Sequence, residues 1–335
     1  MWAHLGKIEA AIATADGRWS ASTQISSSER GAVGVTPDLA VDARGDALAV
    51  WAEKSLDYVP IVRAAYRPAG GQFGPAVDVS PRNAVYGVLS PKVALSSNGR
   101  SAVVWEQDVS GVNTAVEGTV GSVNAWQPPA QLSSPGLWAQ GAHVAMNARG
   151  EAMAGWAEAA LPIGAQSAKR VQVAASQPGG GFGPAVTLDA DPRVLFGDPR
   201  SGASLGVTTG GTAVAVWSRL INERYFATFV AVQSQAGGTW RTQPCLVPAL
   251  RTPPTFAFDP SGSGLLAWGQ PTGSRTVIRA RTIALPSGTP GPAEAVARGS
   301  GGSVVLSAYA GRAPVVGFGL RELGAQLVYS TRPAG

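Results

Sequence analysis

The chain has 335 residues, of which 45% are hydrophobic and only 14% charged, with 43 glycines and 25 prolines. This composition excludes a disordered tail or a coiled coil, and it is typical of many short strands joined by turns. The formal net charge is +5. The basic residues are scattered and form no charge run, so we expect no nucleic-acid partner.

An apolar strand that ends in an aromatic residue recurs along the chain. Successive copies are 54, 51, 61, 51 and 50 residues apart, and they end at Trp51, Trp105, Trp156, Trp217, Trp268 and Phe318. Trp2 precedes Trp51 by 49 residues and fits as the remnant of a further copy. Such regular spacing predicts an internal repeat of about fifty residues.

Each repeat has the same order of expected elements. In the first repeat a strand ends in the glycine turn at 42–45, the tryptophan strand follows, and a third strand covers 61–66. A second turn at 69–73 then leads to a fourth strand at 75–80. Four short antiparallel strands per repeat are typical of a β-propeller blade, so the sequence predicts an all-β propeller without helices.

We expect residues 1–335 to form a single β-propeller domain with six blades. Five blades are continuous, and the sixth joins the two chain ends; the ranges are about 37–81, 91–135, 142–191, 203–248, 255–299, and 304–335 closed by 7–26. This closure leaves one third-strand segment without a place. Seven blades is therefore the alternative.

Two turns carry a family resemblance. Ala15–Trp19 and Ala236–Trp240 resemble degenerate Asp boxes of the sialidase superfamily, which lie between the third and fourth strands of a blade. The pattern at 42–51 is similar to repeats in secreted, largely uncharacterised actinobacterial propellers. The resemblance implies a six-bladed sialidase-like fold. No linear motif carries the sialidase arginine triad, Tyr–Glu pair or Asp acid/base onto positions of this chain.

Loops from the fourth strand to the next blade, and from the second strand to the third, share one face of a propeller, where ligands usually bind. We call it the loop face. Candidate ligand-binding residues in these loops are Arg30, Arg82, Arg193, Arg200, Arg251 and Arg298, with Trp138, Tyr86, Tyr225 and Glu223 beside them. Arginine forks hold carboxylates, and aromatic rings stack on sugars. The alternative is a solvated rim of weak ion pairs.

Glu53, Glu106 and Glu158 follow tryptophan strands and are candidate catalytic residues. If their positions are equivalent, neighbouring blades aim these carboxylates at the same channel mouth. Two carboxylates across a cleft can hydrolyse a glycosidic bond. The structural alternative is that each glutamate forms a salt bridge to a nearby arginine.

We expect the repeated tryptophan side chains to be buried and to fill the space between blades. If they were exposed, they would instead suggest the repeated sugar-binding sites of a multivalent lectin. The single cysteine, Cys245, suits a buried thiol, and two histidines are too few for a histidine-based zinc site, so we expect no metal and no cofactor. No stretch approaches the roughly 20 apolar residues of a membrane span.

These observations favour an extracellular propeller that binds a glycan, an anionic small molecule or a protein partner at the loop face. The alternative is a glycoside hydrolase or lyase that uses paired carboxylates. A start inside a strand suggests that a signal sequence was removed, which predicts a secreted or cell-surface protein. A native start at Met1 predicts a cytoplasmic one.

Overall fold

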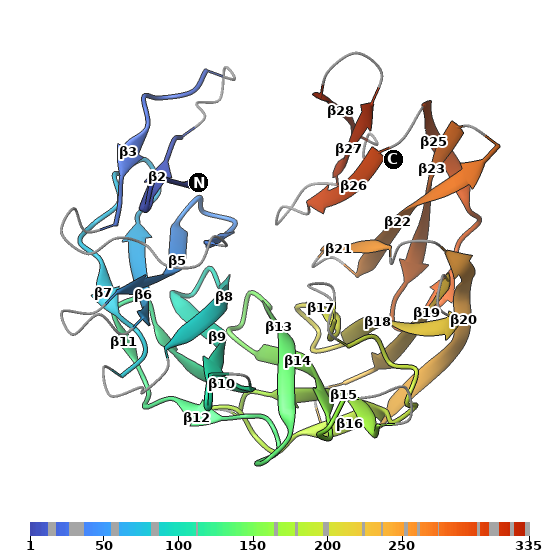
Figure 1. The fold of residues 1–335 in the computed structure, drawn as a ribbon. Helices are drawn as coiled ribbons and strands as arrows, with labels where there is room; N and C mark the ends of the chain where they lie inside the picture. Colours follow the sequence, from blue (N-terminus) through green and yellow to red (C-terminus); the bar gives the residue numbers. More distant parts are fainter. Residues whose placement is uncertain are drawn as a thin grey trace.

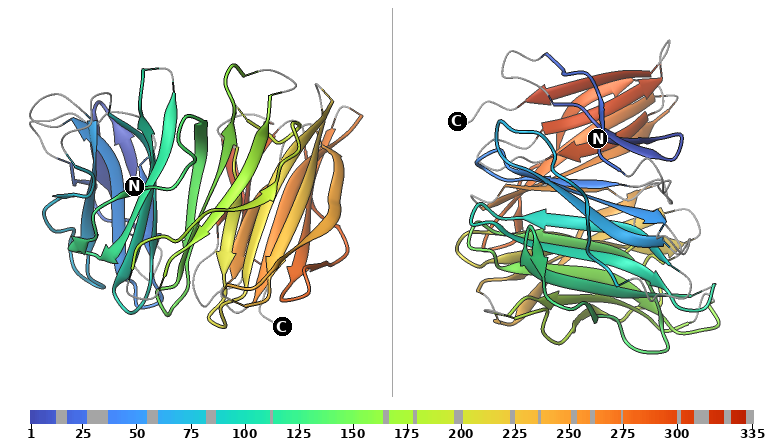
Figure 2. Two further views of the ribbon diagram at one scale, coloured as in Figure 1. Left: turned by 90° about the horizontal axis from the view of Figure 1, so that it is seen from below. Right: turned by 90° about the vertical axis from the view of Figure 1, so that its left-hand side faces the viewer.

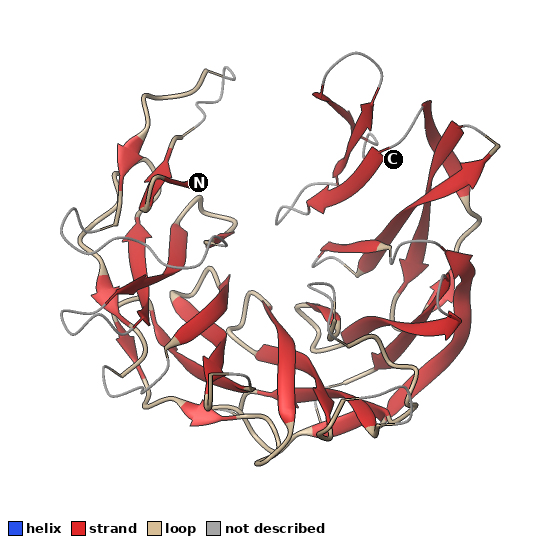
Figure 3. Cartoon of the chain, viewed as in Figure 1, coloured by secondary structure: helices blue, strands red, loops and turns tan. Residues whose placement is uncertain are grey.

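The computed structural model describes the chain except residues 13–17, 27–36, 55–59, 82–86, 112, 164–166, 178–179, 197–200, 223–224, 236, 251–253, 260–261, 274, 300–301, 308–314, 322–324 and 332–335. Side chains are also outside the description at 222, 244–249, 259, 297–299 and throughout 302–331. Every described regular element is a strand (Figure 3). The described strands form seven antiparallel sheets.

The first three sheets follow one another along the chain. The N-terminal sheet contains β1 (Trp2–His4), β2 (Lys7–Ala10) and β3 (Thr23–Gln24). The second contains β4 (Asp38–Val41), β5 (Ala47–Lys54), β6 (Pro60–Arg67) and β7 (Val77–Asp78). The third contains β8 (Val88–Leu95), β9 (Arg100–Asp108), β10 (Thr114–Ser122), β11 (Ala125–Trp126) and β12 (Ala130–Gln131).

The remaining four sheets continue in the same order. The fourth contains β13 (Trp138–Met146), β14 (Ala152–Ala159), β15 (Lys169–Ala175) and β16 (Val186–Asp189). The fifth contains β17 (Ser204–Val207), β18 (Ala213–Asn222), β19 (Tyr225–Gln233) and β20 (Trp240–Leu250). The sixth contains β21 (Thr255–Asp259), β22 (Ser263–Thr272), β23 (Arg275–Ala284), β24 (Thr289–Pro290) and β25 (Glu294–Gly299), and the last contains β26 (Gly302–Ser307), β27 (Val315–Arg321) and β28 (Ala325–Thr331).

The sheets are arranged as spokes of an open arc. Figure 1 shows the first strands β8, β13, β17 and β21 along its concave inner side, and fourth strands such as β12 and β16 on the outside. In Figure 2 successive sheets stand side by side, so the strand ends form two opposite faces. The five central sheets follow the expected repeats within a few residues.

The expected sixth blade, made by joining both ends of the chain, is not confirmed. Among the described strands, β1–β3 pair only with one another, and so do β26–β28. The two chain ends supply one third strand too many for a single blade. Both β2 and β28 occupy the third-strand position of their sheets, and a four-stranded blade has room for only one such strand. Trp2 pairs with Glu9 as Trp51 pairs with Arg63, so the N-terminal sheet is a partial repeat of its own.

Each of the first hairpin turns is stabilised by a polar side chain at the end of the first strand. Asn147 Oδ1 accepts the N–H groups of Arg149 and Glu151, and Asp42 Oδ1 accepts those of Arg44 and Asp46. The turn glycines 45, 99, 150 and 211 have φ between 81° and 90°, a region that favours glycine. These contacts explain why Asp, Asn, Ser or Thr recurs before each turn.

The repeated tryptophans fill the wedges between sheets, as predicted. Trp51, Trp105, Trp156, Trp217 and Trp268 are at most 4% exposed. Each belongs to an apolar cluster shared with the preceding sheet: Trp105 packs with Leu48 and Val62, for example, and Trp156 with Val104 and Val116. The aromatic-tipped strands therefore occupy equivalent places through the central five sheets.

Candidate functional site

Two of the three candidate glutamates lie inside their own sheets. Glu53 is fully buried, and its carboxylate accepts the indole N–H of Trp51 at 2.8 Å and pairs with Arg63 at 3.0 Å. Glu158 is also fully buried; it accepts the indole N–H of Trp156 at 2.9 Å and the backbone N–H of Ser134 at 2.8 Å. A buried indole N–H needs an acceptor, so these carboxylates serve the tryptophan wedges.

Glu106 is not equivalent to the other two glutamates. It follows Trp105 by one residue, whereas Glu53 and Glu158 follow their tryptophans by two. Successive side chains on a strand point to opposite faces, so Glu106 points away from its tryptophan. The expectation that the three carboxylates converge on one channel mouth is therefore wrong in its premise. Glu106 is half-buried and accepts the backbone N–H of Gly141 on β13 at 2.8 Å.

A row of polar residues lies on the inner strands. Each member precedes its tryptophan by thirteen residues and is half-buried, and we call the five together the inner-strand row: Asp38, Lys92, His143, Ser204 and Thr255. Each one pairs across the hairpin with the residue before the tryptophan. Lys92 and His143 lie near the middle of β8 and β13, between the loop-face ends at Val88 and Trp138 and the turns that follow Leu95 and Met146.

Lys92 lies close enough to two other titratable groups, His143 and Glu106, to influence their pKa values. Burial lowers the pKa of His143 to about 4, and the nearby charge of Lys92 acts in the same direction. Burial raises the pKa of Glu106, while the N–H groups of Gly141 and Ala142 and the charge of Lys92 oppose that rise. At neutral pH the histidine is therefore an uncharged hydrogen-bonding group beside an ammonium ion.

Irregularities in strand pairing occur next to Lys92 and His143. The pairing of β8 with β9 shifts between Leu89 and Lys92, and that of β13 with β14 shifts between Gln140 and His143. Ser90 and Gly141 at these shifts have φ of 47° and 66°. Bulges of this kind re-aim side chains near sites. Gln140 donates to the hydroxyl of Ser201 at 3.1 Å, which ties β13 to the segment before β17.

Trp138, the first residue of β13, lies at the loop face. It is half-buried, its indole N–H donates to the Thr114 hydroxyl at 3.1 Å, and its ring meets Phe196 edge-on with centroids 5.5 Å apart. Phe196 therefore braces the ring. Tyr225, also half-buried, begins β19 opposite Asn222 and lies on a different sheet.

The structure describes only a few of the arginines that were expected to form a ring on the loop face. Arg193 is exposed and paired with Asp191 at 2.6 Å, and this partner holds the pKa of Asp191 well below its usual range. Arg298 lies on β25 opposite Val277, without a described side chain. Six candidate ligand-binding residues lie outside the described residues: Arg30, Arg82, Tyr86, Arg200, Arg251 and Glu223.

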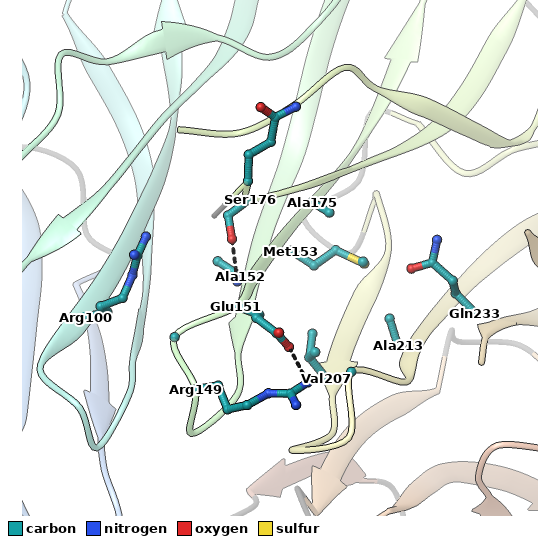
Figure 4. A pocket seen from close by; sticks show the side chains of 13 residues that line it. Arg100, Arg149, Glu151, Ala152, Met153, Ala175, Ser176, Val207, Ala213 and Gln233 are labelled. Atoms are coloured by element: carbon teal, nitrogen blue, oxygen red, sulfur yellow. Dashed lines mark hydrogen bonds and ion pairs between the residues drawn. The ribbon is translucent and has the colours of Figure 1, made fainter. Parts of the chain in front are cut away.

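A pocket lies on the face opposite the loop face, where the first and second hairpin turns meet. We call it the turn-face pocket. It has a volume of about 330 Å³, and its lining includes Arg100, Arg149, Met153, Ser176 and Gln233 (Figure 4). Sequence analysis did not predict it, because its members come from three sheets.

The described residues contain no cluster of three or more His, Cys, Asp or Glu side chains that could hold a metal ion. None of their elements is a helix long and apolar enough to cross a membrane.

The inner-strand row was missed in the sequence, although a signal was present. Aligning the repeats on their tryptophans shows a polar residue thirteen positions earlier in five repeats. The residue types differ at every copy, so no motif marks the position. What the five residues share is their half-buried setting and their place in the register, which the structure shows and the residue types do not.

No known family model and no curated protein matches the sequence. Among solved structures, an ulvan lyase of a polysaccharide lyase family aligns with a TM-score of 0.57 at 9% identity, over 88% of this chain and 78% of that one. A protein of unknown function from Dyadobacter fermentans aligns with a TM-score of 0.53 at 14% identity, over 88% and 92%. A puromycin hydrolase reaches 0.56 at 17% identity, over 97% of this chain and 48% of that one.

These similarities show the fold. The chain has a propeller-like all-β architecture in common with proteins of different activities. The resemblance of the 42–51 pattern to actinobacterial repeats gains no support at the sequence level.

Proposed function

We propose that the chain binds an acidic carbohydrate along the inner-strand row. The carrying observation is the half-buried row itself, with Lys92 beside the uncharged His143 and with hydroxyls on the next two inner strands. An ammonium ion matches a sugar carboxylate or sulfate, and imidazole and hydroxyl groups match sugar hydroxyls. Trp138 offers an aromatic ring at the loop-face end of β13, the strand that also carries His143.

Two further observations support an acidic ligand rather than a neutral one. The chain carries a net charge of +5, which favours the approach of anions. The ulvan lyase that shares the fold has been solved with a bound fragment made of glucuronate and a sulfated rhamnose. A propeller-like fold can therefore present a site to an acidic polysaccharide.

The described tryptophans do not support a lectin with repeated aromatic subsites. The five repeated rings are buried between sheets, where no sugar reaches them. The proposal therefore concerns one site on the inner strands and not one site per blade.

A second candidate function is cleavage of a uronate-containing chain by β-elimination. A glycosidase needs two carboxylates, whereas Glu53 and Glu158 are buried in their own sheets. In an elimination Lys92 would neutralise the uronate carboxylate and His143 would take the proton at C5. The C5–H electrons would form a C4–C5 double bond as the C4–O bond breaks. The leaving oxygen would take a proton, and the candidate acid is Glu106, whose pKa is raised by burial.

Calorimetric titration with glucuronate-containing oligosaccharides and with neutral oligosaccharides of equal length tests the binding function. We expect binding only of the acidic set, with Kd increased at least tenfold by Lys92→Met, because an ion-assisted hydrogen bond is lost. Lys7→Met, which removes an exposed lysine of the N-terminal sheet, is the charge-matched control. Equal affinity in the two variants would overturn the proposal, and ultraviolet absorbance of an unsaturated product separates a lyase from a binder.

A further inference from the structure

In the second sheet, an acidic side chain joins the repeated tryptophan to an arginine. The indole N–H of Trp51 donates to the Glu53 carboxylate at 2.8 Å, and Arg63, which pairs with Trp51 across the strands, holds the same carboxylate at 3.0 Å. Asp78, opposite Arg63 on the fourth strand, forms a second ion pair with this arginine at 3.0 Å. The indole and the guanidinium group are thus joined by a carboxylate.

The sixth sheet has the same tryptophan and arginine without the acidic residues. Arg279 pairs with Trp268, so the two side chains lie on one face of the sheet, as in the second sheet. Two residues after the tryptophan is Gln270, and opposite the arginine is Ala295. Arg279 Nε is buried and has no hydrogen-bond partner. The sixth sheet therefore keeps the two donors and lacks both of the acceptors that the second sheet provides.

Within the described part of the chain, no other acidic residue is placed to take this role. The fourth strand of the preceding sheet, β20, contains no Asp or Glu. Glu294 pairs with Ala280, the neighbour of Arg279, so its side chain leaves from the opposite face of the sheet. Asp259 is the last residue of β21, at the turn-face end. A ligand is therefore the remaining source of an acceptor.

The fifth sheet adds a third donor, Thr228, on the face that packs against Trp268. Thr228 and Val230 are alternate residues of β19, and Val230 shares an apolar cluster with Trp268. Thr228 is fully buried, and its hydroxyl has no hydrogen-bond partner. Its counterpart in the N-terminal sheet is Ile8, which packs with Trp51, since both residues pair with the one that follows a tryptophan. A buried hydroxyl without a partner favours a polar ligand in this place.

These four residues, Trp268, Gln270, Arg279 and Thr228, define what we call the Trp268 wedge, which opens to solvent at Gln270. Gln270 is exposed, whereas Glu53 at the corresponding place is fully buried. Two side chains are also smaller than their counterparts, because Ala295 and Thr228 stand where the other wedge has an aspartate and an isoleucine. A small ligand can therefore enter beside Gln270.

We propose that the Trp268 wedge, between the neighbouring fifth and sixth sheets of Figure 1, binds the carboxylate of a small organic acid. This carboxylate takes the place that the Glu53 carboxylate has in the second sheet. It accepts from the indole N–H of Trp268, from Arg279 and from the Thr228 hydroxyl, and bonds between charged partners are the strongest of these. The surrounding cluster is apolar, which favours a short aliphatic acid over a sugar acid.

Titration of the full chain with propionate, followed through the Trp268 indole N–H signal in heteronuclear NMR spectra, tests this proposal. Trp268→Phe assigns the signal. We expect a saturable shift with propionate and none with propionamide, its uncharged amide, at equal ionic strength, because the charge opposite Arg279 is lost. Arg279→Met should increase the Kd of propionate at least tenfold. Arg275→Met, which removes an exposed arginine of the same strand, should leave it unchanged.

Gln270→Glu supplies a carboxylate from the chain itself. It should shift the Trp268 indole signal without any ligand and abolish the response to propionate. An equal response to propionamide or to chloride, no response at all, or a response kept in Arg279→Met or in Gln270→Glu would overturn the proposal. A circular dichroism spectrum that matches the unchanged chain shows that each variant is folded. Lys92→Met should not alter the propionate response, so failure here leaves the acidic-carbohydrate proposal intact.

Discussion

A buried indole N–H is stabilised by an acceptor, and at three of the repeated tryptophans this chain supplies a carboxylate. Trp51 donates to Glu53, Trp156 to Glu158, and Trp217 to Asp189. Each carboxylate in turn has an arginine near it, and Arg219 holds Asp189 with two bonds of 2.7 Å. Acidic residues beside these tryptophans therefore stabilise the wedge, which leaves Glu106 as the candidate for chemistry.

Replacing Glu53 with alanine should lower the free energy of unfolding by about 3 kcal/mol, since it leaves a buried indole and Arg63 without their shared partner. Glu9→Ala is the matched control, because Glu9 accepts the N–H of the exposed Trp2. We expect a change of under about 1 kcal/mol there. Urea denaturation measures both, and equal losses would contradict the structural role of Glu53.

His143 predicts a pH-dependent stability. Its pKa is about 4 in the folded chain and ordinarily near 6.5, so the unfolded chain takes up this proton first as the pH falls. The associated stability is present above pH 6.5 and is lost as the pH falls toward about 4. His143→Gln removes this contribution, so its unfolding free energy should fall less than that of the unchanged chain. Parallel slopes over this window would contradict the burial of the imidazole.

At the scale of the element, a serine hydroxyl two residues after the fourth strand accepts a hydrogen bond from the third strand in three sheets. Ser26, Ser80 and Ser133 accept the backbone N–H groups of Ile8, Val62 and Val116 at 2.9, 2.9 and 3.0 Å. The short fourth strands β3, β7 and β12 each have two residues. A side-chain acceptor next to each therefore completes the pairing that such a short ladder leaves open.

Ser80→Ala should cost about 1–2 kcal/mol of unfolding free energy, because the N–H of Val62 loses its hydroxyl acceptor in a buried place. Hydrogen exchange at Val62 should accelerate in the same variant. Ser122→Ala, at an exposed strand end, is the control. Unchanged exchange at Val62 would show that another group satisfies this N–H.

The elements differ in how far the sequence predicts them. Tryptophan spacing and turn glycines predict the five central sheets, because both arise from local rules of packing and φ. The predicted pairing of the two chain ends is not confirmed, because a count of strands does not determine which sheet a third strand joins. The prediction that the glutamates are equivalent fails because Glu106 is one residue after its tryptophan, whereas Glu53 is two residues after its own. This difference of one residue turns the Glu106 side chain to the opposite face of its sheet. The turn-face pocket depends on packing among three sheets, which no local pattern encodes.

At the scale of the whole molecule, the N-terminal sheet covers the face of its neighbour. Ile8, Ala10 and Ile25 pack with Trp51 in one apolar cluster. The sheet has no first strand among the described residues, and Leu39 and Val41 of β4 are 40% and 44% exposed. Packing against the preceding sheet, and not strand pairing, therefore holds the arc together from one spoke to the next.

Ile8→Ala should lower the unfolding free energy by about 2–4 kcal/mol, because a fully buried side chain leaves a cavity against Trp51. Leu5→Ala, at 86% exposure, should change it by less than about 0.5 kcal/mol. A comparably small effect at Ile8 would mean that the N-terminal sheet does not pack on Trp51.

The most direct measurement is a crystal structure of the chain with a bound glucuronate-containing tetrasaccharide. The account predicts a carboxylate beside Lys92 and sugar hydroxyls within hydrogen-bond distance of His143 and Ser204, along the inner strands. A sugar bound with equal occupancy at other sheets, or one located only in the turn-face pocket, would contradict it.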